Sequence, residues 1–214
     1  MIKNNFIITA RHISLNAKKQ TYCSKDNRAI TIPYIWFLTD DIKTKSPIDI
    51  CNKLPASSGI LIRCYRIKKK EKLIKGITNL KKRKLHTVLV SGKQRSYSNV
   101  DGAHLPSWLN SSFFINKKLI SMSAHGAKDI RKSINIKADI IFISPVFHTS
   151  SHPGKKILGV IKLGLVAKLF KKPVIALGGI NENNISRLKG LPIFGCAAID
   201  AFKKVPKKMS NNLS

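Results

Sequence analysis

The stretch PVIALGGI, residues 173–180, decides the fold class. Its apolar half suits a strand buried on both faces, and two glycines end that strand before a more polar segment that is compatible with a helix. The same unit recurs along the chain, and this alternation is typical of a parallel sheet with crossover helices. Eight such units predict an α/β fold with a single (β/α)8 TIM barrel. The expected strands are residues 34–38, 59–64, 86–90, 102–105, 119–123, 140–143, 173–177 and 193–198.

The length of 214 residues suits one barrel domain. A Rossmann-like open sheet is the rival fold, but it requires a G-x-G-x-x-G loop after an early strand, and the sequence has none. We assign residues 31–203 to the barrel, 1–30 to an N-terminal extension that we expect to be disordered or loosely packed, and 204–214 to a polar tail. Apolar runs are too short to span a bilayer, so we expect no membrane partner.

The net charge of +30 comes from 40 basic against 10 acidic residues. The lysines form short, dispersed clusters without interleaved aromatic residues or a helix-turn-helix pattern, so we interpret them as a solvated barrel exterior and predict no specific nucleic-acid partner. The four cysteines form no C-x-x-C pair, which indicates reduced thiols in a cytoplasmic protein. The sequence leaves homo-oligomerisation open.

Polar or special residues follow nearly every predicted strand. In a barrel the C-terminal strand ends converge on one mouth, where ligands bind. The pattern therefore predicts an enzyme or a small-molecule binder. These residues are Asp40, Arg63, Ser91, His104, Ser123, His125, Ser144, Gly178, Gly179 and Asp200.

Two segments suit an anionic group. Gly178 and Gly179 allow backbone amides to approach a phosphate, and we expect a helix to open over residues 180–184, with its N-terminus favouring negative charge. The alternative is a tight turn with a helix cap. The loop at residues 144–155 carries hydroxyls, two histidines and a lysine, which suit an anion-binding lid. The alternative there is a plain surface loop.

Three ionisable side chains at strand ends have two interpretations each. His125 suits proton transfer near neutral pH, or it caps the next helix. His104 is interpreted as a structural histidine with satisfied hydrogen bonds. Arg63 ends an apolar strand and needs an anionic partner, which is either the substrate or an internal carboxylate. The candidate carboxylates are Asp40, Asp101 and Asp200.

In order along the chain, these segments resemble the thiamine phosphate synthase/TenI family, from about residue 34 to residue 202. Each segment alone is a weak signal, whereas all of them in order on the predicted strands are specific. The matching segments are residues 36–40 (family pattern LxLVTD), 62–63 (QLRxK), 101–105 (DGVHLGQ), 121–125 (GxSxH), 144–152 (GPVxPTxTK), 176–180 (AIGGI) and 195–201 (GVAVISAI).

The resemblance implies roles for particular residues. In this family the synthase couples an aminopyrimidine diphosphate to a thiazole phosphate and releases pyrophosphate, whereas TenI members aromatise a thiazole carboxylate phosphate with a histidine as acid and base. His125 matches that histidine, and Ser123 matches a serine that contacts diphosphate. Thr149 and Ser151 stand at the two phosphate-contacting threonines, and Gly178 and Gly179 stand at the glycines that hold the thiazole phosphate.

The sequence also departs from the family pattern. The synthase holds Mg²⁺ with two aspartates, but residues 91–93 are Ser-Gly-Lys and residues 106–109 are Pro-Ser-Trp-Leu at those places. Ile62 and Tyr65 replace the Gln and Lys of QLRxK, and His152 replaces the lysine of TxTK. Without these carboxylates a diphosphate leaving group is poorly neutralised. Asp200 replaces a serine beside the phosphate site and needs a compensating cation.

These observations favour a TenI-like isomerase that acts on a phosphorylated heterocycle with no metal or other cofactor. His125 would be the acid and base, and Arg63 and His152 would bind a second anionic group such as a carboxylate. One alternative is a divergent thiamine phosphate synthase, the only case in which Mg²⁺ is implied. Another is a paralogue that binds the ligand without catalysis.

Overall fold

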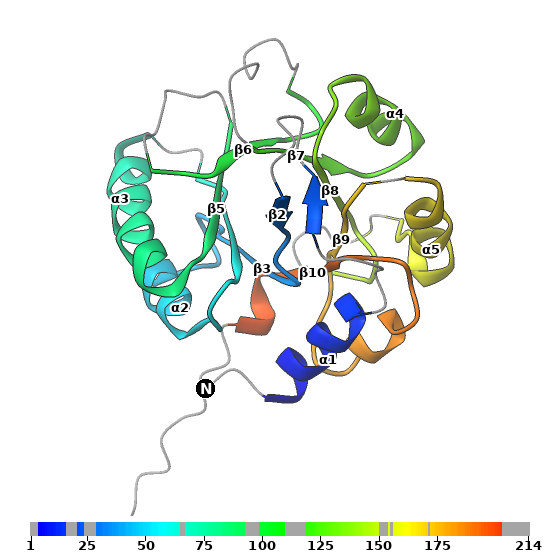
Figure 1. Cartoon of the computed structure of the whole chain (residues 1–214), viewed down its shortest axis with the longest axis horizontal. Helices are drawn as coiled ribbons and strands as arrows, with labels where there is room; N and C mark the ends of the chain where they lie inside the picture. Colours follow the sequence, from blue (N-terminus) through cyan, green and yellow to red (C-terminus); the bar gives the residue numbers. More distant parts are fainter. Residues whose placement is uncertain are drawn as a thin grey trace, which may run out of the picture.

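The computed structural model describes residues 4–15, 21–23, 29–64, 67–92, 99–109, 119–149, 154, 156–170 and 172–202. Eight parallel strands close into a barrel in the order β10-β3-β4-β5-β6-β7-β8-β9 (Figure 1). All eight predicted strands and the predicted TIM-barrel fold are confirmed. The strands are β3 (Ile35–Leu38), β4 (Gly59–Ile62), β5 (Thr87–Ser91), β6 (Gly102–Leu105), β7 (Leu119–Ala124), β8 (Ile140–Ile143), β9 (Val174–Leu177) and β10 (Gly195–Ala198).

Helices cover the outside of the barrel. They are α1 (Asn4–Leu15), α2 (Pro47–Lys53), α3 (Ile67–Lys84), α4 (Ala127–Asn135) and α5 (Gly159–Leu169), with the short 3₁₀ helices η1 (Ile185–Leu188) and η2 (Asp200–Phe202). A two-stranded antiparallel hairpin, β1 (Thr21–Cys23) and β2 (Ala29–Thr31), precedes β3. None of the helices in the described ranges is long and apolar enough to cross a membrane.

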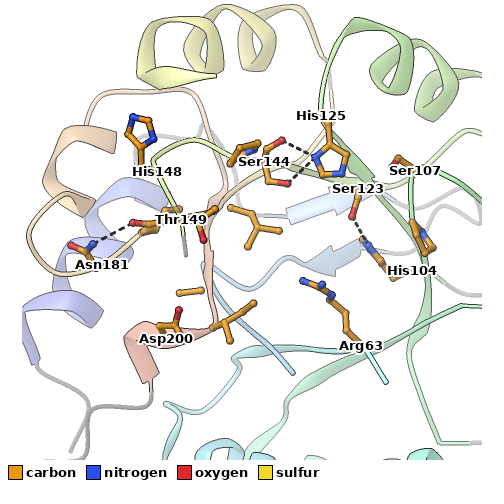
Figure 2. A pocket seen from close by; sticks show the side chains of 18 of the residues that line it. Arg63, His104, Ser107, Ser123, His125, Ser144, His148, Thr149, Asn181 and Asp200 are labelled. Carbon is orange, nitrogen blue, oxygen red and sulfur yellow. Dashed lines mark hydrogen bonds between the residues drawn. The ribbon is translucent and has the colours of Figure 1, made fainter. Parts of the chain in front are cut away.

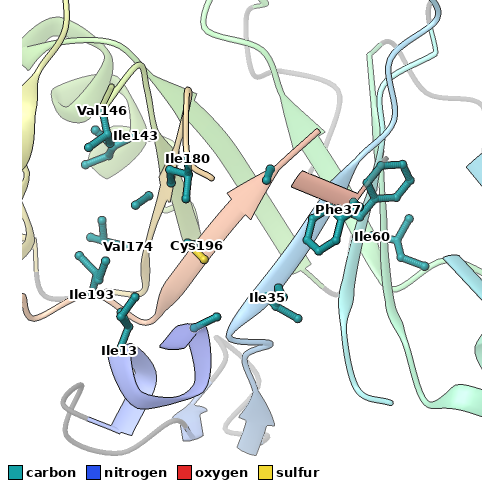
Figure 3. Close-up of a cluster of buried hydrophobic side chains, with 14 of the residues drawn as sticks. Ile13, Ile35, Phe37, Ile60, Ile143, Val146, Val174, Ile180, Ile193 and Cys196 are labelled. Carbon is teal, nitrogen blue, oxygen red and sulfur yellow. The ribbon is translucent and has the colours of Figure 1, made fainter. Parts of the chain in front are cut away.

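Alternate residues of each strand face opposite sides of the barrel wall. One set fills the barrel interior, where the ring of Trp36 packs edge-on against Phe142 at a centroid distance of 5.2 Å. The other set faces the helices and includes Ile35, Val174 and Cys196 (Figure 3). Burial on both faces explains why the strands are almost continuously apolar in sequence.

The N-terminal segment corrects one expectation. We predicted a disordered or loosely packed extension, but α1 packs on the barrel wall beside β10, β3 and η1 (Figure 1). Phe6, Ala10 and Ile13 are buried at a helical spacing of three and four residues. The ring of Phe6 meets Phe202 edge-on at 5.8 Å. Because only the three-residue η2 follows β10 among the described residues, α1 covers the wall that an eighth crossover helix would cover.

Candidate functional site

A cavity of about 660 Å³ lies at the C-terminal ends of the strands (Figure 2). Its size is typical of a small-molecule site. Six predicted site residues line it together, although they come from four different strands or the loops that follow them: Arg63, Ser123, His125, Thr149, Gly178 and Gly179. The two other predicted site residues, Ser151 and His152, lie outside the described residues.

His125 follows β7 and is held by α4 and by the loop after β8. Its backbone N–H donates to the carboxylate of Asp129 in α4 at 2.9 Å. Its ring Nδ1 lies 2.8 Å from the carbonyl oxygen of Ser144 and 3.2 Å from the Ser144 hydroxyl. A carbonyl oxygen only accepts, so Nδ1 carries the hydrogen. Nε2 is therefore the nitrogen left to exchange protons with a ligand.

His104 is a structural histidine, as predicted. Its Nδ1 lies 2.9 Å from the Ser121 hydroxyl. Its Nε2 lies 2.8 Å from the Ser123 hydroxyl (Figure 2). Burial, and secondarily the charge of Arg63, lowers the pKa of His104 to about 3, so the ring is neutral near pH 7.

The direction of these hydrogen bonds decides what Ser123 offers to a ligand. Ser121 donates to the carbonyl of Ala103 at 3.3 Å, so Nδ1 of His104 donates to Ser121 and Nε2 accepts from Ser123. Ser123 thus presents an acceptor to the cavity. This suits a donor group of the ligand better than a phosphate oxygen, which also accepts.

Arg63 extends from the end of β4 into the cavity (Figure 2). Two of its three candidate internal partners are committed elsewhere, since Asp101 pairs with Lys81 at 2.7 Å and Asp200 lies 3.9 Å from Lys43. No ion pair to Arg63 forms within the described part of the chain. Its positive charge is thus directed at the cavity and suits an anionic ligand group.

The charge of Arg63 helps to lower the pKa of Asp40, although the two side chains form no ion pair. Burial alone would raise the pKa of Asp40, but backbone N–H groups of Lys43 and Ile42 and the charges of Arg63 and Lys43 outweigh it, so the pKa is lowered. The two N–H groups donate to one carboxylate oxygen at 2.8 and 3.1 Å. Asp40 is therefore an ionised group that closes the loop after β3.

The glycine pair after β9 is required by its backbone. Gly178 and Gly179 have φ of +97° and +68°, and an added Cβ would meet Pro145 and the carbonyl of His148. The carbonyls of Leu177 and Gly178 accept from Val146 and Phe147, both at 3.0 Å. The carbonyl of Gly179 accepts from Asn184 at 2.8 Å. With these carbonyls turned into the protein, the amides are the groups left for an anion.

The structure corrects the prediction that a helix begins within residues 180–184. The structure has a turn there, held by Asn181 and Asn184, and then the four-residue η1. So short a 3₁₀ helix has no macrodipole large enough to attract an anion, which leaves the glycine amides as the backbone donors in this segment. Asp200, which needed a compensating cation, has Lys43 at 3.9 Å.

Four other cavity residues were not predicted individually from the sequence. His148 lies within the loop after β8 and Asn181 within the segment after the glycine pair, but no pattern marked either of them. Ser107 and Trp108 were noted only within the segment that replaces GQxD. All four line the cavity: Ser107, Trp108, His148 and Asn181.

The residues present do not fit the Mg²⁺ of the synthase. At the end of β5, where the first aspartate was expected, the carbonyl of Ser91 accepts from the ammonium of Lys70 at 2.9 Å. A second cation beside that ammonium would be repelled. At the second place stand Pro106, Ser107, Trp108 and Leu109, with Leu109 at the position of the aspartate. In the described ranges no three His, Cys, Asp or Glu side chains gather to hold a metal ion.

The fold and site define a (β/α)8-barrel protein with a small-molecule cavity at the C-terminal mouth. Residues 98–202 match the family model described as thiamine monophosphate synthase. This part of the chain is therefore similar to the thiamine phosphate synthase/TenI family.

Relatives share this similarity in sequence, and a solved structure shares the fold. Over 97 residues, 43% of this chain and 28% of the relative, it is 38% identical to a thiamine-phosphate synthase of Prochlorococcus marinus. Over 54% of this chain and 59% of the relative, it is 28% identical to a thiamine-phosphate synthase of Clostridium tetani. The chain thus covers less than two thirds of either relative. A thiamine phosphate pyrophosphorylase structure from Pyrococcus furiosus shares the fold, with a TM-score of 0.63, 18% identity, and coverage of 78% of this chain and 85% of that one.

Proposed function

We propose that this protein binds a phosphorylated thiazole at the barrel mouth and isomerises it by proton transfer through His125, without a metal ion. The observation that carries the proposal is the hydrogen bond from Nδ1 of His125 to the Ser144 carbonyl, 2.8 Å long. It holds the ring at the cavity and leaves Nε2 to take a proton from one ligand atom and return one to another. The atoms of the ligand are unchanged in number, so the reaction requires no redox partner.

The other cavity residues would hold the ligand in place. The amides of Gly178 and Gly179, with Thr149, would bind its phosphate. Arg63 would bind a second anionic group such as a carboxylate, since its charge is directed at the cavity. Ser123 would accept a hydrogen bond from the ligand. Ser151 and His152 remain predicted ligand contacts.

The test is turnover of the thiazole carboxylate phosphate by His125→Gln. NMR monitors the reaction, in a buffer that contains EDTA. We expect turnover to fall by at least about 100-fold, the usual contribution of a general acid–base group, with ligand affinity changed only a few-fold. His12→Gln is the matched control, because His12 is an exposed histidine on α1. Turnover by His125→Gln at the wild-type rate would contradict the role of His125. Binding without turnover by the wild-type protein would indicate a non-catalytic paralogue.

A divergent thiamine phosphate synthase is the second candidate, because the relatives compared above carry that name. It predicts that the protein joins an aminopyrimidine diphosphate to a thiazole phosphate and releases pyrophosphate. The cationic side chains at the cavity would have to neutralise the negative charge of the pyrophosphate leaving group. Detection of pyrophosphate from this pair of substrates would favour the synthase over the isomerase.

A further inference from the structure

Trp108 is a large aromatic side chain at the cavity that is mostly exposed. It lines the cavity and is 67% exposed, whereas Trp36, the other tryptophan, is fully buried in the barrel interior. An exposed aromatic residue by itself is ordinary. An exposed aromatic residue is suited to contact a ligand when it lines a cavity and its backbone is held in place by other elements.

The turn that carries Trp108 is fixed in this way. The N–H of Leu109 donates to the carbonyl of Pro106 at 3.0 Å and closes the turn. The ammonium of Lys132, from α4, donates to the carbonyls of Ser107 at 2.8 Å and Leu109 at 2.9 Å, the residues on either side of Trp108. The side chain of Leu109 is buried against the barrel wall. These contacts hold the backbone of Trp108 in one position.

The place of Trp108 in the barrel relates it to the phosphate end of the site. Trp108 follows β6, and the glycine pair follows β9, three strands away around the ring. Both line the same cavity. A ligand whose phosphate binds at Gly178 and Gly179 would therefore extend its other end across the mouth toward Trp108. His125, after β7, lies between the two along the ring.

We infer that Trp108 is the surface on which the planar ring of the ligand stacks, and that Lys132 is the positioning residue that holds this surface. The ligand class is a phosphorylated heteroaromatic compound, and the inference rests on the phosphate site of the proposed function. Stacking on an indole favours flat aromatic rings, and it needs no metal ion. Trp108 directly precedes Leu109, which stands where the family pattern has a metal-binding aspartate, so this turn carries an aromatic ring and no carboxylate.

The two tryptophans make the inference directly measurable. A ring stacked on Trp108 quenches its fluorescence, whereas Trp36 in the barrel interior stays constant as an internal reference. We would titrate the protein with a thiazole phosphate, an aminopyrimidine phosphate and inorganic phosphate, and measure the same affinities by calorimetry. The first two ligands carry different rings and distinguish which ring binds, and inorganic phosphate carries none.

Variants separate stacking from a structural role. We expect Trp108→Leu to bind the ring-bearing phosphate about 10-fold more weakly, with unchanged affinity for inorganic phosphate, and Trp108→Phe to restore most of the loss. Lys132→Met should weaken ring binding about 3-fold, because a mobile platform must be ordered on binding. Lys128→Met, on the exposed side of the same helix, is the charge-matched control and should have no effect.

The outcomes test the stacking inference separately from the proposed ligand class. Equal affinity of wild type and Trp108→Leu for the ring-bearing phosphates, or no quenching at saturation, would overturn the stacking inference while the phosphate site stands. If inorganic phosphate binds and neither ring-bearing compound binds more tightly, the inference also fails. If none of the three binds, the proposed ligand class fails with it. Loss of turnover in His125→Gln tests the catalytic proposal independently of Trp108.

Discussion

Replacing Gly179 by alanine should disable the proposed phosphate site by distorting the backbone. Gly179 has φ of +68°, a conformation that costs an alanine about 1–2 kcal/mol. Its new Cβ would also collide with the carbonyls of His148 and Phe147, and such overpacking costs about 1–3 kcal/mol more. Because Phe147 is hydrogen bonded to Gly178, the collision would separate the loops after β8 and β9. We predict a total destabilisation of about 2–5 kcal/mol and at least 10-fold weaker phosphate binding.

Gly190 provides the matched control for this prediction. Its φ is +79°, but an alanine Cβ there would meet nothing within 4 Å. Gly190→Ala should therefore cost only the conformational part, about 1–2 kcal/mol, and leave phosphate affinity unchanged. Urea denaturation measures the stabilities, and calorimetry with inorganic phosphate measures the affinities. If Gly179→Ala binds phosphate as tightly as Gly190→Ala, the glycine pair is not the phosphate site.

Two further predictions concern stability. Phe6→Ala should lower the free energy of unfolding by about 3–5 kcal/mol in urea denaturation, because the ring is buried against Phe202. Ile8→Ala, half-exposed on the same helix, should change it little, and equal effects would contradict the packing of α1. The pKa of His104, lowered by burial to about 3 from an ordinary 6.5, means that only the unfolded chain takes up this proton as the pH falls from 7 to 5. This group should therefore reduce the free energy of unfolding by about 2 kcal/mol over that interval, and His104→Gln should remove that part of the pH dependence. An unchanged slope in the variant would show that His104 is not neutral in the fold.

The eight strands could be located from the sequence because each is apolar on both faces and ends at a polar or glycine residue. Their polar ends then had to converge, so Arg63, His125 and the glycine pair could be placed in one site before the structure was known. Position along a strand carries this information because a closed parallel barrel has one C-terminal mouth.

Other features depend on tertiary contacts that no local pattern specifies. The 12 residues of α1 are only weakly amphipathic, and their burial depends on the wall left open beside β10. The turn at Asn181 replaces the expected helix because asparagine side chains hydrogen bond to the nearby backbone. The turn that carries Trp108 is held by Lys132, which lies 24 residues later in the chain.

Calorimetry of the purified protein with a thiazole phosphate, in EDTA and then in excess Mg²⁺, is the most direct test of a metal-independent thiazole phosphate site. We predict binding in EDTA with an affinity that Mg²⁺ does not change, because no described carboxylate cluster is available to hold the ion at the cavity. Binding that appears only with Mg²⁺ would contradict this prediction and favour the synthase. No binding under either condition would exclude the thiazole phosphate as the ligand.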